Sequence, residues 1–233
     1  AAMDHLDLDS PRRPWLPPLP TLVSRPAPEP GVDPTWAIAD DPARQQQRAV
    51  TWGPMTSVLI IGPAGSGRSS AALAIASGAM AARSPNDLVV YAVGSGPSVD
   101  AIAGLPHCGG AIGPDDERGM RAVTERLGRL VDRTGSDLGP RALLVIDGWD
   151  GLLGGRASAA WSRAVEPLLH VLRRGRGHGL EMISTGDASL SHGPLRSLTD
   201  ATLALRLANR VDAVSLGVPG ALMTADTPGR GVL

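Results

Sequence analysis

A glycine-rich turn between two apolar segments constrains this chain more than any other feature. Residues 62–69 read Gly-Pro-Ala-Gly-Ser-Gly-Arg-Ser and fit the pattern G-x-x-x-x-G-K-[ST], except that Arg68 stands where lysine is expected. The β-branched run 58–61 before it predicts a buried strand, and the alanine-rich segment 69–83 after it predicts a helix. Such a turn gathers backbone N–H groups and a helix N-terminus around one point, where they stabilise an anion. The sequence therefore predicts a phosphate-binding loop.

The phosphate-binding loop supplies the first candidate site residues. Ser69 would offer its hydroxyl to Mg²⁺, because hard cations prefer oxygen ligands. Arg68 can pair with phosphate, but its planar fork differs in shape from the compact ammonium group of lysine. A glycine-rich turn that holds no ligand is the alternative. The residues expected to bind ATP are Gly62, Pro63, Ala64, Gly65, Ser66, Gly67, Arg68, Ser69 and Ser70.

Two polar residues at the ends of predicted strands complete the candidate site. Asp147 follows the apolar run 143–146, where a carboxylate can hold Mg²⁺ through water. Thr185 ends the predicted strand 180–185, where a polar side chain can sense a terminal phosphate. Asp147 and Thr185 are the catalytic candidates, and Ser69 and Asp147 are the candidates for Mg²⁺ binding. The alternatives are a turn or helix-capping role for Asp147 and an ordinary strand-end threonine.

The rest of the sequence alternates short apolar runs with helical patterns. This alternation predicts an α/β domain at residues 51–233, with a mostly parallel sheet and helices on both faces. Pro167 should kink or split the last predicted helix, because proline lacks the N–H group. Residues 105–110 read as a structural turn around His107. The predicted strands are 58–61, 88–93, 142–146, 180–185 and 201–207, and the predicted helices are 69–83, 118–133 and 158–174.

Residues 1–50 differ from the rest in their high proline content. Proline at five of the ten positions 11–20 predicts an extended, polyproline-like arm. Trp15, Leu16 and Leu19 are apolar enough to pin this arm against a surface. It is either a linker strapped to its own domain or a docking peptide for another domain. The Ala-Ala-Met start and the abrupt end indicate a piece excised from a longer protein.

Composition excludes several other classes of function. The formal net charge is −1 and the chain has no lysine, so electrostatics do not favour a nucleic-acid-binding surface. A single cysteine, Cys108, excludes an internal disulfide and a multi-cysteine metal site. No apolar run approaches the roughly 18 residues of a membrane span. Arg206 and Arg230 are candidate fingers toward a neighbour's nucleotide, with shaping of the final turn as the alternative for Arg230.

With these motifs placed, the chain resembles the FtsK/SpoIIIE-type ring ATPases, which have a RecA/FtsK-like P-loop NTPase fold. It is most similar to EccC-like ATPases of type VII (ESX) secretion in actinobacteria. Only the phosphate-binding loop is specific by itself, and the order and spacing of all the motifs carry the resemblance. The matching segments are 15–20, 40–47, 62–70, 105–110, 144–149, 203–207 and 228–231.

The resemblance implies a middle, second ATPase domain in a protein with tandem ATPase domains behind a membrane anchor. The cofactors would be ATP and Mg²⁺. The partners would be the neighbouring ATPase domains and secreted substrates of the WXG type, within a parent protein able to form a hexameric ring. Such a domain is cytoplasmic, meets the membrane only through its parent protein, and does not take nucleic acid as a partner.

Three departures from the family indicate slow or absent hydrolysis. Arg68 replaces the lysine, Gly148 occupies the position of the catalytic acid, and residues 184–187 replace a Gln-Arg-Pro pattern of DNA-pumping relatives. Asp150 could replace the acid only if the turn redirects it. Loss of one stabilising group can cost roughly 10²–10³ in rate. We therefore expect an ATP-binding domain that regulates a secretion motor, with a DNA-translocase domain and a non-nucleotide interaction module as alternatives.

Overall fold

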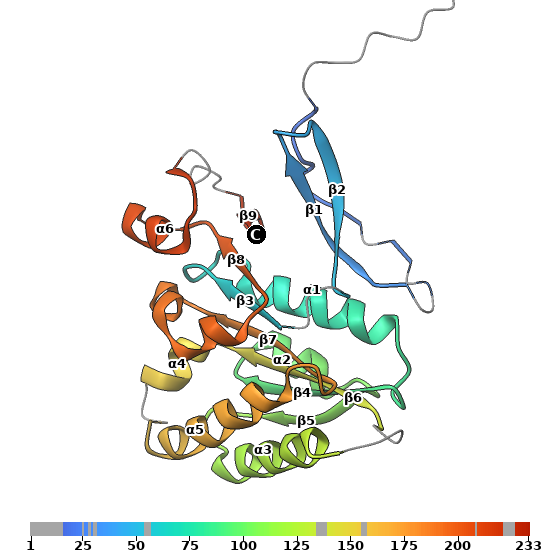
Figure 1. Cartoon of the computed structure of the whole chain (residues 1–233), viewed down its shortest axis with the longest axis vertical. Helices are drawn as coiled ribbons and strands as arrows, with labels where there is room; N and C mark the ends of the chain where they lie inside the picture. The colour runs from blue at the N-terminus through green and yellow to red at the C-terminus, as the bar shows by residue number, and fades with distance from the viewer. Residues whose placement is uncertain are drawn as a thin grey trace, which may run out of the picture.

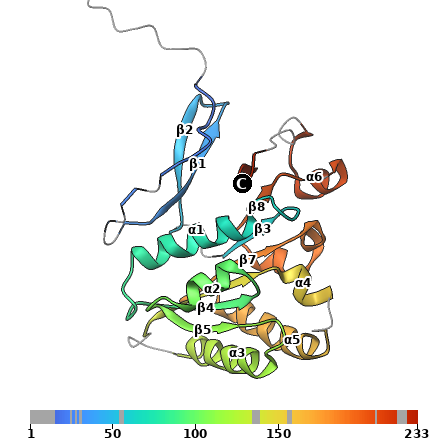
Figure 2. The same ribbon diagram turned by 180° about the vertical axis from the view of Figure 1, so that it is seen from behind.

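A seven-stranded sheet forms the centre of the computed structural model, and helices cover both of its faces (Figures 1 and 2). The strand order is β5-β4-β6-β7-β3-β8-β9, and only the short β9 runs antiparallel to its neighbour. The predicted α/β fold with a mostly parallel sheet is confirmed. The strands are β3 (Ser57–Ile61), β4 (Leu88–Gly94), β5 (Cys108–Ile112), β6 (Arg141–Asp147), β7 (Leu180–Gly186), β8 (Ala201–Leu205) and β9 (Gly231–Val232). The structure describes residues 16–24, 26–27, 29, 32–53, 57–133, 139–154, 158–207, 209–220 and 227–233.

Alternating side chains of β3 divide the interior into two cores. Val58 and Ile60 pack with α1 and α2 on one face, whereas Leu59 and Ile61 pack with α3 and α5 on the other. All four side chains are fully buried, so the strand reads as one continuous apolar run. The helical elements are α1 (Arg68–Ala81), α2 (Pro97–Ala103), α3 (Glu117–Val131), α4 (Trp149–Gly154), α5 (Ser158–Gly175), η1 (Ala188–His192), η2 (Pro194–Leu198) and α6 (Arg210–Leu216).

The five predicted strands correspond to β3, β4, β6, β7 and β8, and the three predicted helices to α1, α3 and α5. Two details need comment. Of the kink or split expected at Pro167, the split is absent: α5 continues past it and buries Leu168 and Leu169 in the core, and the kink stays a prediction. The strand predicted over 201–207 ends at Leu205, because Arg206 has a positive φ of 29°, which breaks the extended conformation.

Only the first half of the turn predicted over residues 105–110 is a turn, because the second half belongs to a strand. His107 lies in it, with its Nε2 2.9 Å from the carbonyl oxygen of Arg83. Cys108 already begins the edge strand β5, which runs parallel to β4. Gly109 must lack a side chain there, because a Cβ atom would lie 2.5 Å from a methyl group of Val89. Because glycine is unfavourable in strands in general, the glycine-rich sequence of β5 did not predict a strand.

A hairpin of β1 (Thr35–Asp41) and β2 (Gln46–Thr51) replaces the last part of the predicted extended arm. Figure 1 shows it above α1, outside the seven-stranded sheet. The polyproline-like conformation expected of the arm therefore does not extend over residues 35–50, which pair as strands. The prolines that suggested it all precede β1 or lie in the hairpin turn, where proline is tolerated. Trp15, one expected anchor of the arm, lies outside the described residues.

Trp52 joins this hairpin to the main domain. Its side chain is 1% exposed, and its Nε1 donates a 2.7 Å hydrogen bond to Glu181 at the start of β7. Glu181 is equally buried and also accepts from Arg141 at 2.8 Å and from Arg83 at 3.4 Å. A buried carboxylate is tolerated only when donors surround it. The indole N–H is therefore part of what satisfies the buried Glu181 side chain.

We expect Trp52→Phe to lower the free energy of unfolding by about 1–3 kcal/mol, because a buried acceptor loses its donor. Urea unfolding of the purified domain measures this difference. Trp36→Phe is the matched control, because the Nε1 of Trp36 is buried without a hydrogen-bond partner in the described part of the chain. An equal loss in both variants would mean that ring volume, and not the bond to Glu181, holds the hairpin.

Candidate nucleotide site

The phosphate-binding loop connects the end of β3 to the start of α1, as the sequence predicted. Gly65 and Gly67 have φ angles of +77° and +98°, a region that residues with side chains rarely adopt. No described residue lies within 4 Å of the position where a Cβ of Gly65 would be, so the described part of the chain leaves the loop open on that side. Gly67 caps the N-terminus of α1, and Arg68 and Ser69 are the first helical residues. The loop backbone is therefore accessible at Gly65, directly before the N-terminus of α1.

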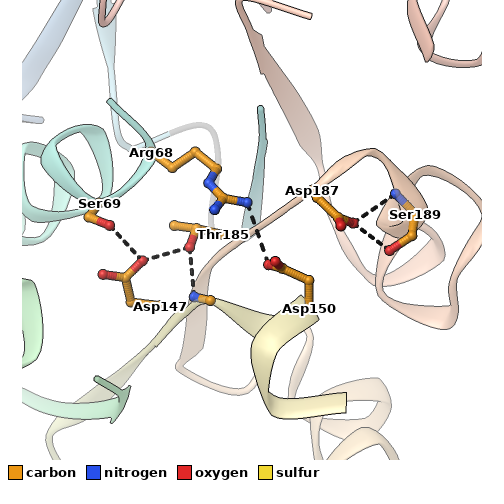
Figure 3. Close-up of polar contacts among 8 residues, drawn as sticks. Arg68, Ser69, Asp147, Asp150, Thr185, Asp187 and Ser189 are labelled. Carbon is orange, nitrogen blue, oxygen red and sulfur yellow. Dashed lines mark hydrogen bonds and ion pairs between the residues drawn. The ribbon is translucent and has the colours of Figure 1, made fainter. Parts of the chain in front are cut away.

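Asp147 is the centre of a hydroxyl cluster beside this loop (Figure 3). The Ser69 hydroxyl donates to Asp147 Oδ1 at 3.0 Å, and the Thr185 hydroxyl donates to the same oxygen at 2.7 Å. The carboxylate is 7% exposed. The structure thus brings together Ser69, Asp147 and Thr185, which lie far apart in the sequence, at the carboxyl edge of the parallel sheet.

Thr185 orients Asp147 in this structure. Its Oγ1 accepts a 2.8 Å hydrogen bond from the backbone N–H of Gly148 while it donates to the carboxylate. Both hydrogen-bonding roles of the hydroxyl are therefore used within the site, which is more than an ordinary strand-end threonine requires. A role in sensing a terminal phosphate remains a prediction.

Ser98 is a site residue that the sequence reasoning missed. It lies in the first turn of α2, is 3% exposed, and its hydroxyl donates to Asp147 Oδ2. The turn before it comes close to the same residue, because a Cβ on Gly94 would lie 2.2 Å from the backbone oxygen of Asp147. The position of Ser98 in the chain could have indicated its role. Residues 95–98 follow the end of β4, which runs parallel and next to β6, so they reach the same edge of the sheet as Asp147.

Arg68 does not extend into open space but pairs with Asp150. The guanidinium Nη1 lies 3.4 Å from Asp150 Oδ1, and Figure 3 shows the two side chains directed toward each other. Gly148, with a φ of +87°, turns the chain back so that Asp150 faces the phosphate-binding loop. The redirecting turn that the sequence required for Asp150 is therefore present, and it delivers the carboxylate to Arg68.

The C-terminal segment lies against the phosphate-binding loop. The backbone N–H of Gly229 donates to the Ser66 carbonyl oxygen at 2.9 Å. Arg230 was a candidate finger toward a neighbour's nucleotide, but here its Nη2 donates to the carbonyl oxygen of Leu19 at 2.8 Å. Pro17 of the arm accepts a second bond, from Gln47. The bond from Arg230 ties the arm to the domain, and the bond from Gln47 ties the first part of the arm to β2. Both roles foreseen for Arg230, a finger and a shaper of the final turn, stay predictions.

Other features of the described residues do not compete with this site. No cluster of three or more His, Cys, Asp or Glu side chains among them could hold a metal ion by itself. A cavity of about 620 Å³ is lined by residues of β4, α3 and β6 together with Asp132, Arg133 and Pro140, and by none of the phosphate-binding loop. Of the described helices, none combines the length and apolar character needed to span a bilayer.

Known proteins resemble this chain in sequence and in fold. The ESX-5 secretion system protein EccC5 of Mycobacterium marinum is 27% identical over 213 residues, which cover 78% of this chain and 15% of that protein. The structure of EssC (ATPases 2 and 3) from Geobacillus thermodenitrificans superimposes with a TM-score of 0.80 at 18% identity, over 93% of this chain and 45% of that one. The chain is similar in sequence to EccC proteins and shares the fold of the EssC and EccC ATPase domains. No protein-family model matches the sequence.

A second solved structure supports the same fold for the EccC-like domain. The cytoplasmic domain of the Thermomonospora curvata type VII secretion ATPase EccC superimposes with a TM-score of 0.64 at 17% identity, over 83% of this chain and 24% of that one. The resemblance based on sequence motifs is thus confirmed. The chain spans only about a sixth of the length of the curated relatives that it matches.

Proposed function

We propose that this EccC-like domain binds ATP with Mg²⁺, hydrolyses it slowly or not at all, and so regulates a type VII secretion motor. One observation carries the proposal. Ser69 Oγ and Asp147 Oδ1 lie 3.0 Å apart at the N-terminus of α1, next to a glycine loop that is open at Gly65. A hydroxyl and a carboxylate oxygen are ligands that Mg²⁺ prefers, and the helix N-terminus favours the phosphates that accompany it.

The residues present fit both groups. Gly65 leaves the loop backbone accessible to phosphate oxygens, and Ser69 and Asp147 offer hard oxygen ligands on one side of it. Mg²⁺ would supply positive charge that neutralises the phosphate oxygens. Ser69 would hold the cation directly, and Asp147 would orient its water ligands. Thr185 and Ser98 would keep the carboxylate in place.

Slow hydrolysis follows from what surrounds Asp147. Gly148 offers no side chain to polarise water, and the nearest following carboxylate, Asp150, is paired with Arg68. Removal of a single catalytic group typically costs about 10²–10³ in rate. The backbone groups that bind phosphate are untouched by these changes, so binding is expected to outlast catalysis.

The wider role is inferred from the relatives. They are much longer proteins, and the aligned solved structures include tandem ATPases. We therefore place this domain on the cytoplasmic side of the membrane, as a second ATPase domain beside its neighbours and within reach of WXG-type substrates. The formal net charge of −1 gives no support to the alternative of a DNA translocase.

Equilibrium dialysis of the domain against ATP and Mg²⁺, followed by chromatography of the retained nucleotide, tests the proposal. The expected result is one retained nucleotide per domain, recovered as ATP after many hours. Rapid recovery as ADP would refute the weak-catalysis part of the proposal. No retention by the folded domain would refute nucleotide binding and favour the interaction-module alternative.

A further inference from the structure

Arg68 is the one cationic side chain of the phosphate-binding loop, and a carboxylate of the same chain already holds it. The Arg68–Asp150 pair lies 3.4 Å apart, and its side chains are only 18% and 27% exposed. Lysine at this position is the usual phosphate ligand, so the guanidinium stands where a nucleotide would need positive charge. Asp150 therefore occupies the partner position that a phosphate group would take.

Three features hold Asp150 in place independently of Arg68. The positive φ of Gly148 turns the chain toward the loop. The adjacent Trp149, only 2% exposed, anchors the start of α4 in the core. Gly186 at the end of β7 leaves room for Leu190 and for the carboxylate, because a Cβ there would lie 2.1 Å from Leu190 Cδ1 and 3.1 Å from Asp150 Oδ1. The fold thus positions the backbone of Asp150 beside the loop independently of the arginine.

From these observations we infer that Asp150 is an internal counter-ion that competes with nucleotide phosphates for Arg68 and lowers the affinity of the site. The inference rests on the proposed nucleotide binding. Phosphate oxygens and the Asp150 carboxylate carry like charges, and both are attracted to the same guanidinium. Neither can approach Arg68 fully without weakening the contact of the other.

The competition also connects the nucleotide to α4. Asp150 lies in the first turn of α4 and Arg68 in the first turn of α1, so their pair links the two helices. A phosphate that draws Arg68 away releases this link. By thermodynamic reciprocity, a neighbouring domain that moves α4 away from α1 raises the affinity for nucleotide by the same factor. Arg68 in place of lysine then allows a neighbouring domain to regulate the nucleotide affinity of the site, in addition to lowering its catalytic ability.

Calorimetric titration of the domain with Mg-ATP tests the inference through a double-mutant cycle on Arg68 and Asp150. Asp150→Asn should tighten binding by about twofold to fivefold, the range for a partly exposed ion pair. In an Arg68→Ala background the same change should leave the dissociation constant nearly unaltered. Asp187→Asn is the matched control, because Asp187 is drawn beside the site in Figure 3 but accepts its hydrogen bond from Ser189.

The outcomes separate this inference from the proposed function. The inference would be overturned if Asp150→Asn tightened Mg-ATP binding equally with and without Arg68. It would also be overturned if Asp187→Asn tightened binding as much, because either result would mean that any lost negative charge near the site has this effect. Unchanged or weaker binding by Asp150→Asn would overturn it as well, with nucleotide binding intact. Failure of the folded wild-type domain to bind would refute the proposed function itself.

Discussion

Replacing Asp147 by Asn should abolish the advantage that Mg²⁺ gives to ATP binding. The variant keeps the shape of the side chain and an oxygen that accepts from Ser69 and Thr185. It loses the charge that orients the cation. A charge-assisted contact is worth about 1.5–3 kcal/mol, so the affinity for Mg-ATP should fall by roughly tenfold to a hundredfold.

Parallel titrations with Mg-ATP and with ATP in EDTA measure this effect. ATP without the cation should bind the variant as well as the wild type or slightly better, because a negative charge near the phosphates is gone. Ser69→Ala should show the same selective loss, since it removes the other oxygen ligand. Equal weakening of both nucleotide forms by Asp147→Asn would contradict a metal-linked role and indicate a damaged site.

Ser98→Ala should have the second largest effect, on both stability and binding. Asp147 is 7% exposed, and Ser98 supplies the only donor to its Oδ2 that the described residues provide. An unsatisfied buried acceptor costs about 1–3 kcal/mol, so the free energy of unfolding should drop by that amount. The carboxylate would also gain freedom to rotate, which should weaken Mg-ATP binding about threefold to tenfold and spare ATP in EDTA.

Urea unfolding and the two titrations give the three readouts for Ser98→Ala. Ser191→Ala serves as control, because its hydroxyl donates to the Ala188 carbonyl oxygen and not to the site. That variant should lose less stability and keep the full Mg²⁺ dependence. If Ser98→Ala lowers stability but leaves the Mg²⁺ dependence intact, Ser98 is a structural residue only.

Local pattern was sufficient to predict the central elements of the fold. Residues 58–61 are buried on both faces and therefore read as a continuous apolar run, and α3 shows its buried residues at helical spacing. The hairpin β1–β2 and the edge strand β5 were missed because their residues are only partly buried and include proline-flanked or glycine-rich segments. Weakly buried strands depend on their partners, which a single sequence does not reveal.

The site residues that belong to a sequence motif could be predicted. Those that only the tertiary structure brings to the site could not. The spacing of the phosphate-binding loop and the strand end at Asp147 indicated two of its parts. Ser98 has no motif and is a site residue only because β4 lies next to β6. The pairing of Arg68 with Asp150 depends on a positive φ at Gly148, which glycine allows but does not dictate.

Calorimetric titration of the wild-type domain with Mg-ATP, beside Ser69→Ala, shows whether the phosphate-binding loop holds a nucleotide. We expect saturable binding at one site, weakened about tenfold or more when the Ser69 hydroxyl is removed. Circular dichroism of both proteins establishes that they are folded. A flat titration of the folded wild-type domain, or equal binding by both proteins, would contradict a nucleotide site at the phosphate-binding loop.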